Sequence, residues 1–138
     1  MKFSIALLAA AITGSAFAAP TKRADPNWTI ESMKRTCNSA NTQCVWDFGI
    51  NTHLAPTTHC TFTVKGTKAS QLPGTGAACG AYTVTSGWSG QFGAGNGFTT
   101  LAVVDNTKHL ITWPAYTDKQ LVNGVAVKPD QSYPPTKL

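Results

Sequence analysis

The sequence lacks the short motifs that mark the common enzyme and cofactor-binding classes. It contains no GxSxG nucleophile elbow and no HExxH zinc motif. Its four cysteines include no CxxC pair, a spacing that structural zinc sites use. The run Gly93-x-Gly95-x-Gly97 departs from the dinucleotide fingerprint, because a β-like run follows it where a helix should begin. We therefore expect no cofactor and no bound metal.

The chain also lacks a basic cluster. Its formal net charge is +5, from 11 Lys and Arg against 6 Asp and Glu. Lys2, Lys22 and Arg23 lie in the first 23 residues, so removal of that segment would leave 8 against 6, or +2. The only adjacent basic pair left is Lys34-Arg35. Because nucleic acids and anionic membranes are bound through clustered positive charge, we exclude both as partners.

The first 18 residues have the pattern of a secretory signal peptide. Lys2 is followed by an apolar, alanine-rich core from Phe3 to Phe17, and Ala16-Phe17-Ala18 supplies the small-x-small cleavage sequence. This segment is too short for a membrane-spanning helix, and no later run reaches that length. The pattern predicts an extracellular protein.

A short pro-segment, residues 19–23, follows and ends in Lys22-Arg23, which resembles a processing site of the fungal secretory pathway. We expect the mature chain to begin at Ala24 or, as the alternative, at Ala19. Residues 24–138 should form a single domain and exist as a monomer. Near its start, Asn27-Trp28-Thr29 is the one N-glycosylation sequon, so Asn27 is the predicted glycosylation site.

Four cysteines in a secreted chain indicate two disulfide bonds. Three pairings are possible. We favour Cys37–Cys44 together with Cys60–Cys79, because each bond would then join segments that we interpret as neighbouring strands. Closed loops of about 8 and 20 residues would stabilise the fold by about 2.5 and 3.3 kcal/mol in the chain-entropy treatment.

The stretch from Tyr82 to Asp105 organises the predicted fold. Two runs rich in Thr, Val and aromatic residues, Tyr82–Ser86 and Phe98–Asp105, flank a span with glycine at 87, 90, 93, 95 and 97. Such runs fit a pleated, half-buried surface, and glycine allows the backbone to turn and approach closely. We therefore predict a sheet that turns sharply at this point.

Further β patterns precede and follow this stretch. Alternation is clearest from Gln43 to Ile50, where Cys44, Trp46, Phe48 and Ile50 share one face. The other predictions are strands at Trp28–Thr36, Cys60–Lys65 and Leu110–Trp113, a flexible loop over 66–78, a turn at 105–108, a hairpin over Leu121–Val127 with its turn at Asn123-Gly124, and an extended or frayed tail from Pro129. Seven or eight short strands without a long helix predict an all-β fold, a small antiparallel barrel or sandwich, and we place the barrel first.

Acidic residues and histidines are present, but their spacing matches no known catalytic motif. A ribonuclease-like site would need Glu31, Arg35 and His109 in one cleft, which nothing in their spacing demands. A glycoside hydrolase would need a carboxylate pair such as Asp47 and Asp105, yet Asp105 is explained by its turn and Asp47 by the outer face of its strand.

A metal site would draw on His53 and His59, which lie in or beside one loop, where histidines are usually only solvated. We therefore assign no catalytic residue.

Aromatic residues remain as candidates for a binding surface. Trp46 and Trp113 lie in apolar alternation, so we expect both in the core. Trp88, Phe92 and Tyr116 form the candidate surface, with Trp88 and Phe92 in the glycine-rich span. Tryptophan rings on a β surface can stack on sugars, which makes a wall polysaccharide one candidate ligand.

Four segments resemble a family of small secreted fungal proteins that includes hypersensitive-response-inducing elicitors. They are WTIESMKRTC (28–37), CVWDFG (44–49), YTVTSGWSGQFG (82–93) and WPAYTD (113–118), and the four cysteines fit the family. The resemblance implies a β-barrel-like fold, secretion into the space around plant cells and detection by plant immunity. It carries over no catalytic residues.

The predicted function is that of an effector or elicitor bound by a plant cell-surface receptor or an apoplastic protein. A cell-wall carbohydrate-binding module is the first alternative, and a small secreted hydrolase such as a ribonuclease is the second.

Overall fold

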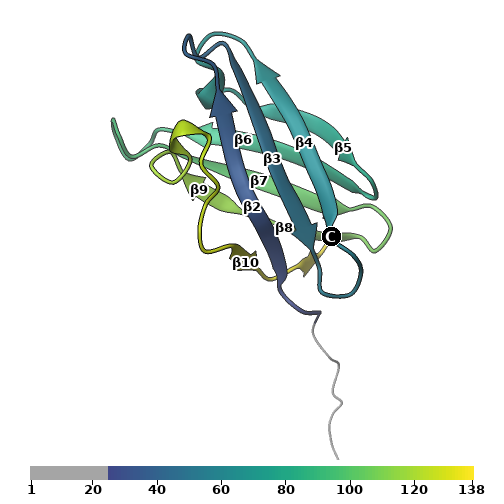
Figure 1. Cartoon of the computed structure of the whole chain (residues 1–138). Helices are drawn as coiled ribbons and strands as arrows, with labels where there is room; N and C mark the ends of the chain where they lie inside the picture. Colours follow the sequence, from purple (N-terminus) through teal and green to yellow (C-terminus); the bar gives the residue numbers. More distant parts are fainter. Residues whose placement is uncertain (1–24) are drawn as a thin grey trace, which may run out of the picture.

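Two antiparallel sheets face each other (Figure 1). Buried apolar side chains fill the space between them. The computed structural model describes residues 25–138, so the predicted signal peptide (1–18) and pro-segment (19–23) lie outside the described residues. Over the described residues, no helix has the length and apolar character needed to cross a bilayer. The fold is all-β, as expected.

The first sheet has four strands in the order β10-β2-β3-β4, and the second has six, in the order β11-β8-β7-β6-β5 with β9 paired to β7. The bounds are β2 Trp28–Cys37, β3 Gln43–Asn51, β4 Thr58–Lys65, β5 Gly74–Cys79, β6 Tyr82–Ser89, β7 Phe98–Asp105, β8 Leu110–Thr112, β9 Ala115–Thr117, β10 Gln131–Tyr133 and β11 Thr136–Lys137. Two 3-10 turns, η2 (Ala69–Gln71) and η3 (Val122–Gly124), lie in the connections.

The two sheets form a sandwich, so the preference for a closed barrel is wrong. Strand β4 pairs with β3, and β5 pairs with β6, but no backbone ladder joins β4 to β5 among the described residues. The chain between them crosses from one sheet to the other and contains η2. Only residues 66–73 of the predicted 66–78 loop lie outside a strand, because β5 begins at Gly74.

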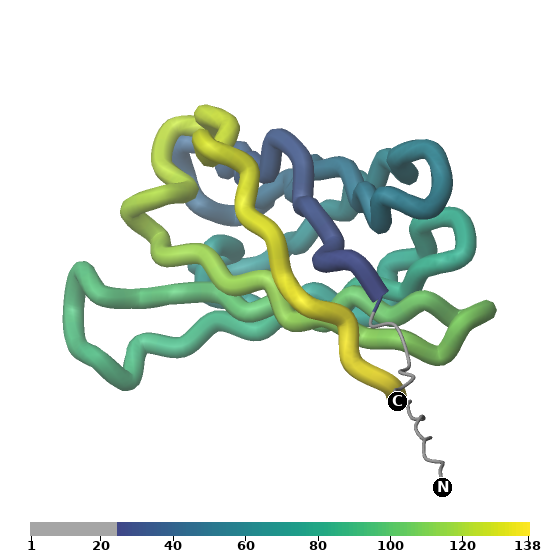
Figure 2. Tube along the Cα trace, turned by 90° about the horizontal axis from the view of Figure 1, so that it is seen from below, coloured from purple at the N-terminus to yellow at the C-terminus, as the bar shows by residue number. Residues whose placement is uncertain are grey.

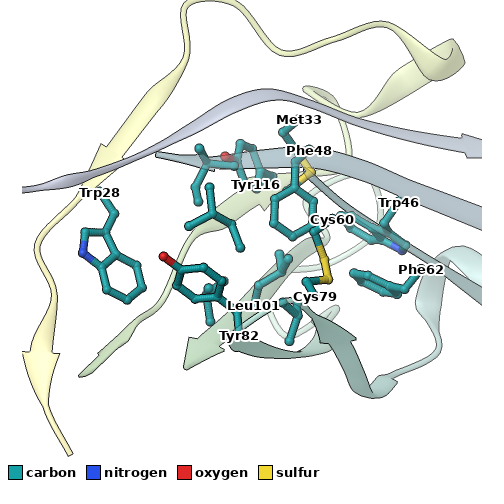
Figure 3. Packing of buried hydrophobic residues seen from close by; sticks show 14 of the residues in the cluster. Trp28, Met33, Trp46, Phe48, Cys60, Phe62, Cys79, Tyr82, Leu101 and Tyr116 are labelled. Atoms are coloured by element: carbon teal, nitrogen blue, oxygen red, sulfur yellow. A yellow bond between two sulfur atoms is a disulfide. The ribbon is translucent and has the colours of Figure 1, made fainter. Parts of the chain in front are cut away.

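Strict alternation along β3 and β7 builds the core. Every second side chain of each strand is buried, from Cys44 to Ile50 and from Thr99 to Asp105. Aromatic rings fill the space between the sheets, with Trp28 edge-on to Tyr82 at a centroid distance of 5.8 Å and Phe48 edge-on to Phe62 at 6.5 Å (Figure 3). The predicted alternation over Gln43–Ile50 is confirmed.

A bulge in β2 changes which of its side chains face inward. The register to β3 shifts between Glu31 and Lys34, where Ser32 has a φ of 50°. The expected inward face of Trp28, Ile30 and Ser32 is therefore broken at Ser32, and Met33 and Arg35 are buried instead. An extra residue in one strand of an antiparallel pair re-aims the side chains beyond it in this way.

Both predicted disulfides are present. Cys37–Cys44 joins the neighbouring strands β2 and β3, as expected. Cys60–Cys79 joins β4 to β5 and therefore links the two sheets rather than two paired strands. The predicted pairing of the four cysteines is confirmed, but the expectation that each bond joins neighbouring strands holds only for Cys37–Cys44.

The predicted hairpin over Leu121–Val127 is wrong, although its turn forms. Asn123 and Gly124 have positive φ, as a type I′ turn requires, and the N–H of Val125 donates to the carbonyl of Val122. Leu121 and Val127 are buried in the sandwich core instead of pairing with each other. Tertiary burial outweighs the local strand tendency here.

The C-terminal tail is extended, but it is not frayed. Strand β10 pairs with β2, and β11 pairs with β8, so the tail runs from the four-stranded sheet to the six-stranded one (Figure 2). The cis peptide between Lys128 and Pro129 precedes β10, and the pair Pro134-Pro135 lies in the crossing segment between β10 and β11. The tail therefore covers one open side of the sandwich.

Removing the inter-sheet disulfide should cost more stability than removing the local one. In the chain-entropy treatment, Cys60→Ala with Cys79→Ala should lower the free energy of unfolding by about 3.3 kcal/mol, against about 2.5 kcal/mol for Cys37→Ala with Cys44→Ala. Urea unfolding of the two double variants beside the wild type measures both losses. A larger loss for the Cys37–Cys44 variant would contradict the role given to the inter-sheet bond.

Tyr116 should make stability fall at high pH. Burial, and then the neighbouring Tyr133, raises the pKa of the Tyr116 phenol far above its ordinary value of 10.0. The unfolded chain releases this proton near pH 10 and the native chain does not, so stability present below pH 10 is lost as the pH rises. Tyr116→Phe should reduce the slope of unfolding free energy against pH above 10 by up to about 1.4 kcal/mol per pH unit. An unchanged slope would show that Tyr116 ionises freely in the native state.

Candidate interaction surface

The glycine-rich loop between β6 and β7, residues 90–97, is built around Trp88. A Cβ atom at Gly97 would lie 2.7 Å from the indole, and one at Gly90 would lie 2.5 Å from it. Real Cβ atoms do not approach other atoms so closely, so these two positions require glycine for the loop to wrap around the ring. The chain does reverse within the predicted span 87–97, but only over residues 90–97, because Gly87 and Trp88 still belong to β6.

Asp118, which follows β9, holds Trp88 in place from the other side. The indole Nε1 of Trp88 donates to Oδ2 of Asp118 at 2.8 Å, and the backbone N–H of Asp118 donates to the carbonyl of Gly97 at 2.9 Å. Asp118 therefore ties the start and the end of the loop to the chain beyond β9.

The second carboxylate oxygen of Asp118 reaches across the sandwich to Arg35 of β2. Nη1 of Arg35 donates to Oδ1 of Asp118 at 3.0 Å and to the carbonyl of Ser70 at 3.4 Å. The guanidinium also lies over the Trp46 ring, 5.6 Å from its centroid. Only 8% of the Arg35 side chain is exposed, and 32% of that of Asp118. A buried guanidinium needs such a partner, so this pair couples the loop to the four-stranded sheet.

Beside Arg35 there is a hollow of about 460 Å³ between the end of β2, Ser70 and the η3 turn. Nε of Arg35 is buried and has no hydrogen-bond partner among the described residues. Val122 and Val125, both more than half exposed, stand on the same turn. Polar and apolar side chains both line the hollow, Val122 among the apolar ones, and the charge of Arg35 is already paired inside.

The tip of the loop presents Phe92 to solvent. Its side chain is 66% exposed and stacks on Phe98 with ring centroids 5.7 Å apart. Two successive turns shape the backbone, because Gly93 N–H donates to the carbonyl of Gly90 and Asn96 N–H to that of Gly93. The loop projects from one end of the sandwich (Figure 2). An exposed aromatic ring on a braced loop has the character of a protein-binding anchor.

The outer face of the six-stranded sheet continues from Phe98 and carries no charge on the described strands. Its outward positions are Ala78, Thr83, Thr85, Gly87, Ser89, Phe98, Thr100, Ala102, Val104, Ile111, Ala115, Thr117 and Thr136. Trp113 adjoins them, half exposed. By contrast, the outer face of the four-stranded sheet bears Glu31, Lys34, Asp47, His59 and Lys65. We call the first of these surfaces the uncharged face.

Two aromatic predictions need correction. Tyr116 is 1% exposed and packs in the core against Tyr133, so it does not lie on the predicted surface. Of the other two residues predicted there, Phe92 is exposed, whereas the loop and Asp118 enclose Trp88 and leave it only partly exposed. Trp113 is 50% exposed rather than buried, because Thr112 and Pro114 on either side of it are buried and the unbroken alternation turns Trp113 outward. Trp46 is in the core, as expected. Asn27, the predicted glycosylation site, is exposed ahead of β2.

The three residues proposed for a ribonuclease-like site are not brought together. Glu31 lies on the outer face of β2 and accepts a hydrogen bond from Asn51, whereas Arg35 of the same strand points inward. His109 is exposed in the β7–β8 turn.

The glycosidase pair is separated as well. Asp105 is buried and accepts hydrogen bonds from the backbone N–H groups of Thr107 and Lys108, so it caps its turn. Asp47 lies on the other sheet and contacts His59 at 2.5 Å, while His53 bonds to Thr29. Glu31, Asp47 and His59 do line one shallow hollow of about 240 Å³, a grouping that spacing alone did not indicate. No cluster of three metal-ligating side chains occurs in residues 25–138.

Substitution of Asp118 should show that it braces the loop. Asp118→Ala removes both acceptors and leaves Arg35 buried without its counter-charge, so we expect a loss of about 2–3 kcal/mol, below the range for fully buried pairs because Asp118 is a third exposed. Trp88→Phe removes one hydrogen bond and should cost about 1 kcal/mol beyond its loss of ring area. Urea unfolding measures both. Equal, small effects would mean that the carboxylate is solvated and braces nothing.

Comparison with known proteins identifies relatives over nearly the whole chain. A family model described as Effector TSP1 matches residues 29–138. A protein of Hypocrea virens named Effector TSP1 is 54% identical over 144 residues, which cover 99% of this chain and 97% of that protein. The residues that the family model matches run from the second residue of β2 to the end of the chain. The chain belongs to the Effector TSP1 family.

Proposed function

We propose that this chain is a secreted effector that acts by being bound, and that a plant cell-surface receptor or apoplastic protein recognises it and starts a hypersensitive-type defence response. The observation that carries the proposal is Phe92, a 66% exposed aromatic ring on a loop fixed by Trp88 and Asp118. A preformed aromatic anchor loses little conformational entropy on binding, which favours recognition. Family membership supports the effector role itself.

The separation of the catalytic candidates also supports a role in binding. Glu31, Arg35 and His109 do not converge, and Asp105 serves its own turn. The hollow of about 460 Å³ beside β2 contains an arginine whose charge is already neutralised by Asp118. A surface with one exposed anchor needs no bound cofactor to be recognised.

A neutral wall polysaccharide is the second candidate ligand, and the uncharged face favours it. Thr83 and Thr85 of β6 and Thr100 of β7 place hydroxyls on this face, and Trp113 offers a half-exposed indole beside them. Such a surface suits a flat, uncharged ligand that can stack on the indole, because neither partner has a charged group that would lose its water on contact. Trp113→Ala should then abolish retention on insoluble glucan or chitin.

Leaf infiltration with purified protein tests the first proposal. Cell death and oxidative burst are scored over a dilution series of residues 24–138, beside Phe92→Ala and a reduced, alkylated sample. If Phe92 is a hot spot worth about 2 kcal/mol, the variant should need about 30-fold more protein for a half-maximal response. Leu54→Ala is the matched control, because Leu54 is also an exposed apolar side chain, at 56%.

The reduced sample separates a folded surface from a linear segment, since reduction removes both disulfides. A response that Phe92→Ala and reduction both weaken, and Leu54→Ala does not, agrees with the proposal. The proposal fails if native protein gives no response, or if Phe92→Ala and Leu54→Ala act alike.

A further inference from the structure

One sheet edge differs from all the others in the described chain. Edge strand β10 has three residues, β11 has two, and β9 has three. Edge strand β5 contains Gly76 with a φ of 62° and an irregular register between Gly74 and Ala77. Short, bulged or proline-flanked strands of this kind prevent further strands from adding to a sheet.

Strand β4 has none of these protections. It is eight residues long, contains neither Gly nor Pro, and pairs with β3 in continuous register from Thr58 to Lys65. No strand pairs with its other side in residues 25–138. An open, regular edge of this length offers a row of unpaired backbone donors and acceptors.

The direction of these backbone groups follows from the ladder. Gly66 N–H donates to the carbonyl of Thr42, which continues the β3–β4 ladder by one pair. Backbone groups alternate in direction along an antiparallel strand, so Phe62 and Val64 also face β3. Thr61, Thr63 and Lys65 therefore direct their N–H and C=O groups away from the sheet.

A groove of about 410 Å³ runs beside this edge. Phe62 to Lys65 of β4 line one side, and Pro73, Gly74, Thr75 and Ala77 line the other. The Cys60–Cys79 bond ties β4 to β5 at the far end, so the edge opens toward Lys65. Phe62 and Val64 make the inner side of the groove apolar, whereas Thr61, Thr63 and Lys65 lie on the outer face.

We propose that this edge of β4 binds an extended segment of another polypeptide, which adds as a further strand beside Thr61–Lys65. Side chains alternate across a strand, so the segment places apolar residues inward, against Phe62 and Ala77. Its outward residues are polar, with an acidic one beside Lys65. A second copy of this chain suits the edge less well, because symmetric pairing would need the whole strand and β5 is tied to β4 at Cys60. This site is separate from Phe92 and does not depend on the proposed function.

A synthetic peptide tests the pairing. The probe is a labelled seven-residue peptide with blocked ends that alternates valine with threonine and carries one glutamate. Two further versions are N-methylated on alternate amides. In the first version the methylated amides all lie along one edge of the extended peptide, and in the second they all lie along the opposite edge. Fluorescence anisotropy with residues 24–138 should show saturable binding of the parent peptide, a loss of about tenfold or more for one methylated version, and little change for the other.

Proline at position 63 tests the protein side of the same contact. Thr63→Pro removes an outward N–H that β3 does not use, so the strand should still form, and binding should weaken about tenfold. Thr63→Ala keeps the N–H and should bind as the wild type does. A thermal melt checks folding, and Lys65→Pro replaces Thr63→Pro if the latter unfolds.

Three results would overturn the proposal. The first is absence of saturable binding by the parent peptide. The second is that Thr63→Pro binds the parent peptide as tightly as the wild type does, or that both methylated peptides bind the wild type as tightly as the parent peptide does. The third is a dimer of residues 24–138 that Thr63→Pro converts to monomer, since the occupant of the edge would then be a second copy. Leaf infiltration with Thr63→Pro distinguishes the β4 edge from the loop that carries Phe92. The plant response proposed to depend on Phe92 should remain in this variant.

Discussion

A guanidinium held between two sheets is the constraint on which much of this structure depends. Arg35 is 7% exposed, and a charge so far from water requires a counter-charge and hydrogen bonds. Asp118 supplies both, and its second oxygen accepts from Trp88. Because Gly90 and Gly97 pack on that same indole, the position of the solvent-exposed loop is set by an ion pair inside the sandwich.

The inward position of Arg35 depends in turn on the bulge in β2. Without the register shift after Glu31, Lys34 would face the core and Arg35 would face solvent. The tail stabilises that bulge, because Asp130 accepts a hydrogen bond from the N–H of Ser32 at 2.9 Å. A segment at the end of the chain thus contributes to the geometry of a loop formed some 40 residues earlier in the sequence.

Sequence patterns correctly predicted the strands and turns that are determined by residues close to one another in the chain. The alternation over Gln43–Ile50 and the turn at Asp105 depend on neighbours within a few residues, and both are confirmed. The Asn123-Gly124 turn also forms, but the core takes Leu121 and Val127, so no hairpin follows. A bulge leaves no clear mark in composition, and for that reason neither the inward Arg35 nor its pairing with Asp118 was foreseen. Likewise, the apolar character of Trp113 concealed the alternation around it, in which Thr112 and Pro114 take the inward positions and leave the indole half exposed.

The two outer faces suggest a division of tasks within one small domain. The four-stranded sheet carries the charged side chains, Asp47 beside His59 among them, and charge keeps such a face solvated. The six-stranded sheet carries none at its outward positions and merges with Phe92 through Phe98. Desolvating an uncharged face costs less than desolvating a charged one, so a macromolecular partner is more readily accommodated there. The braced aromatic loop then supplies what a flat face lacks, a projecting side chain that fixes where the partner sits.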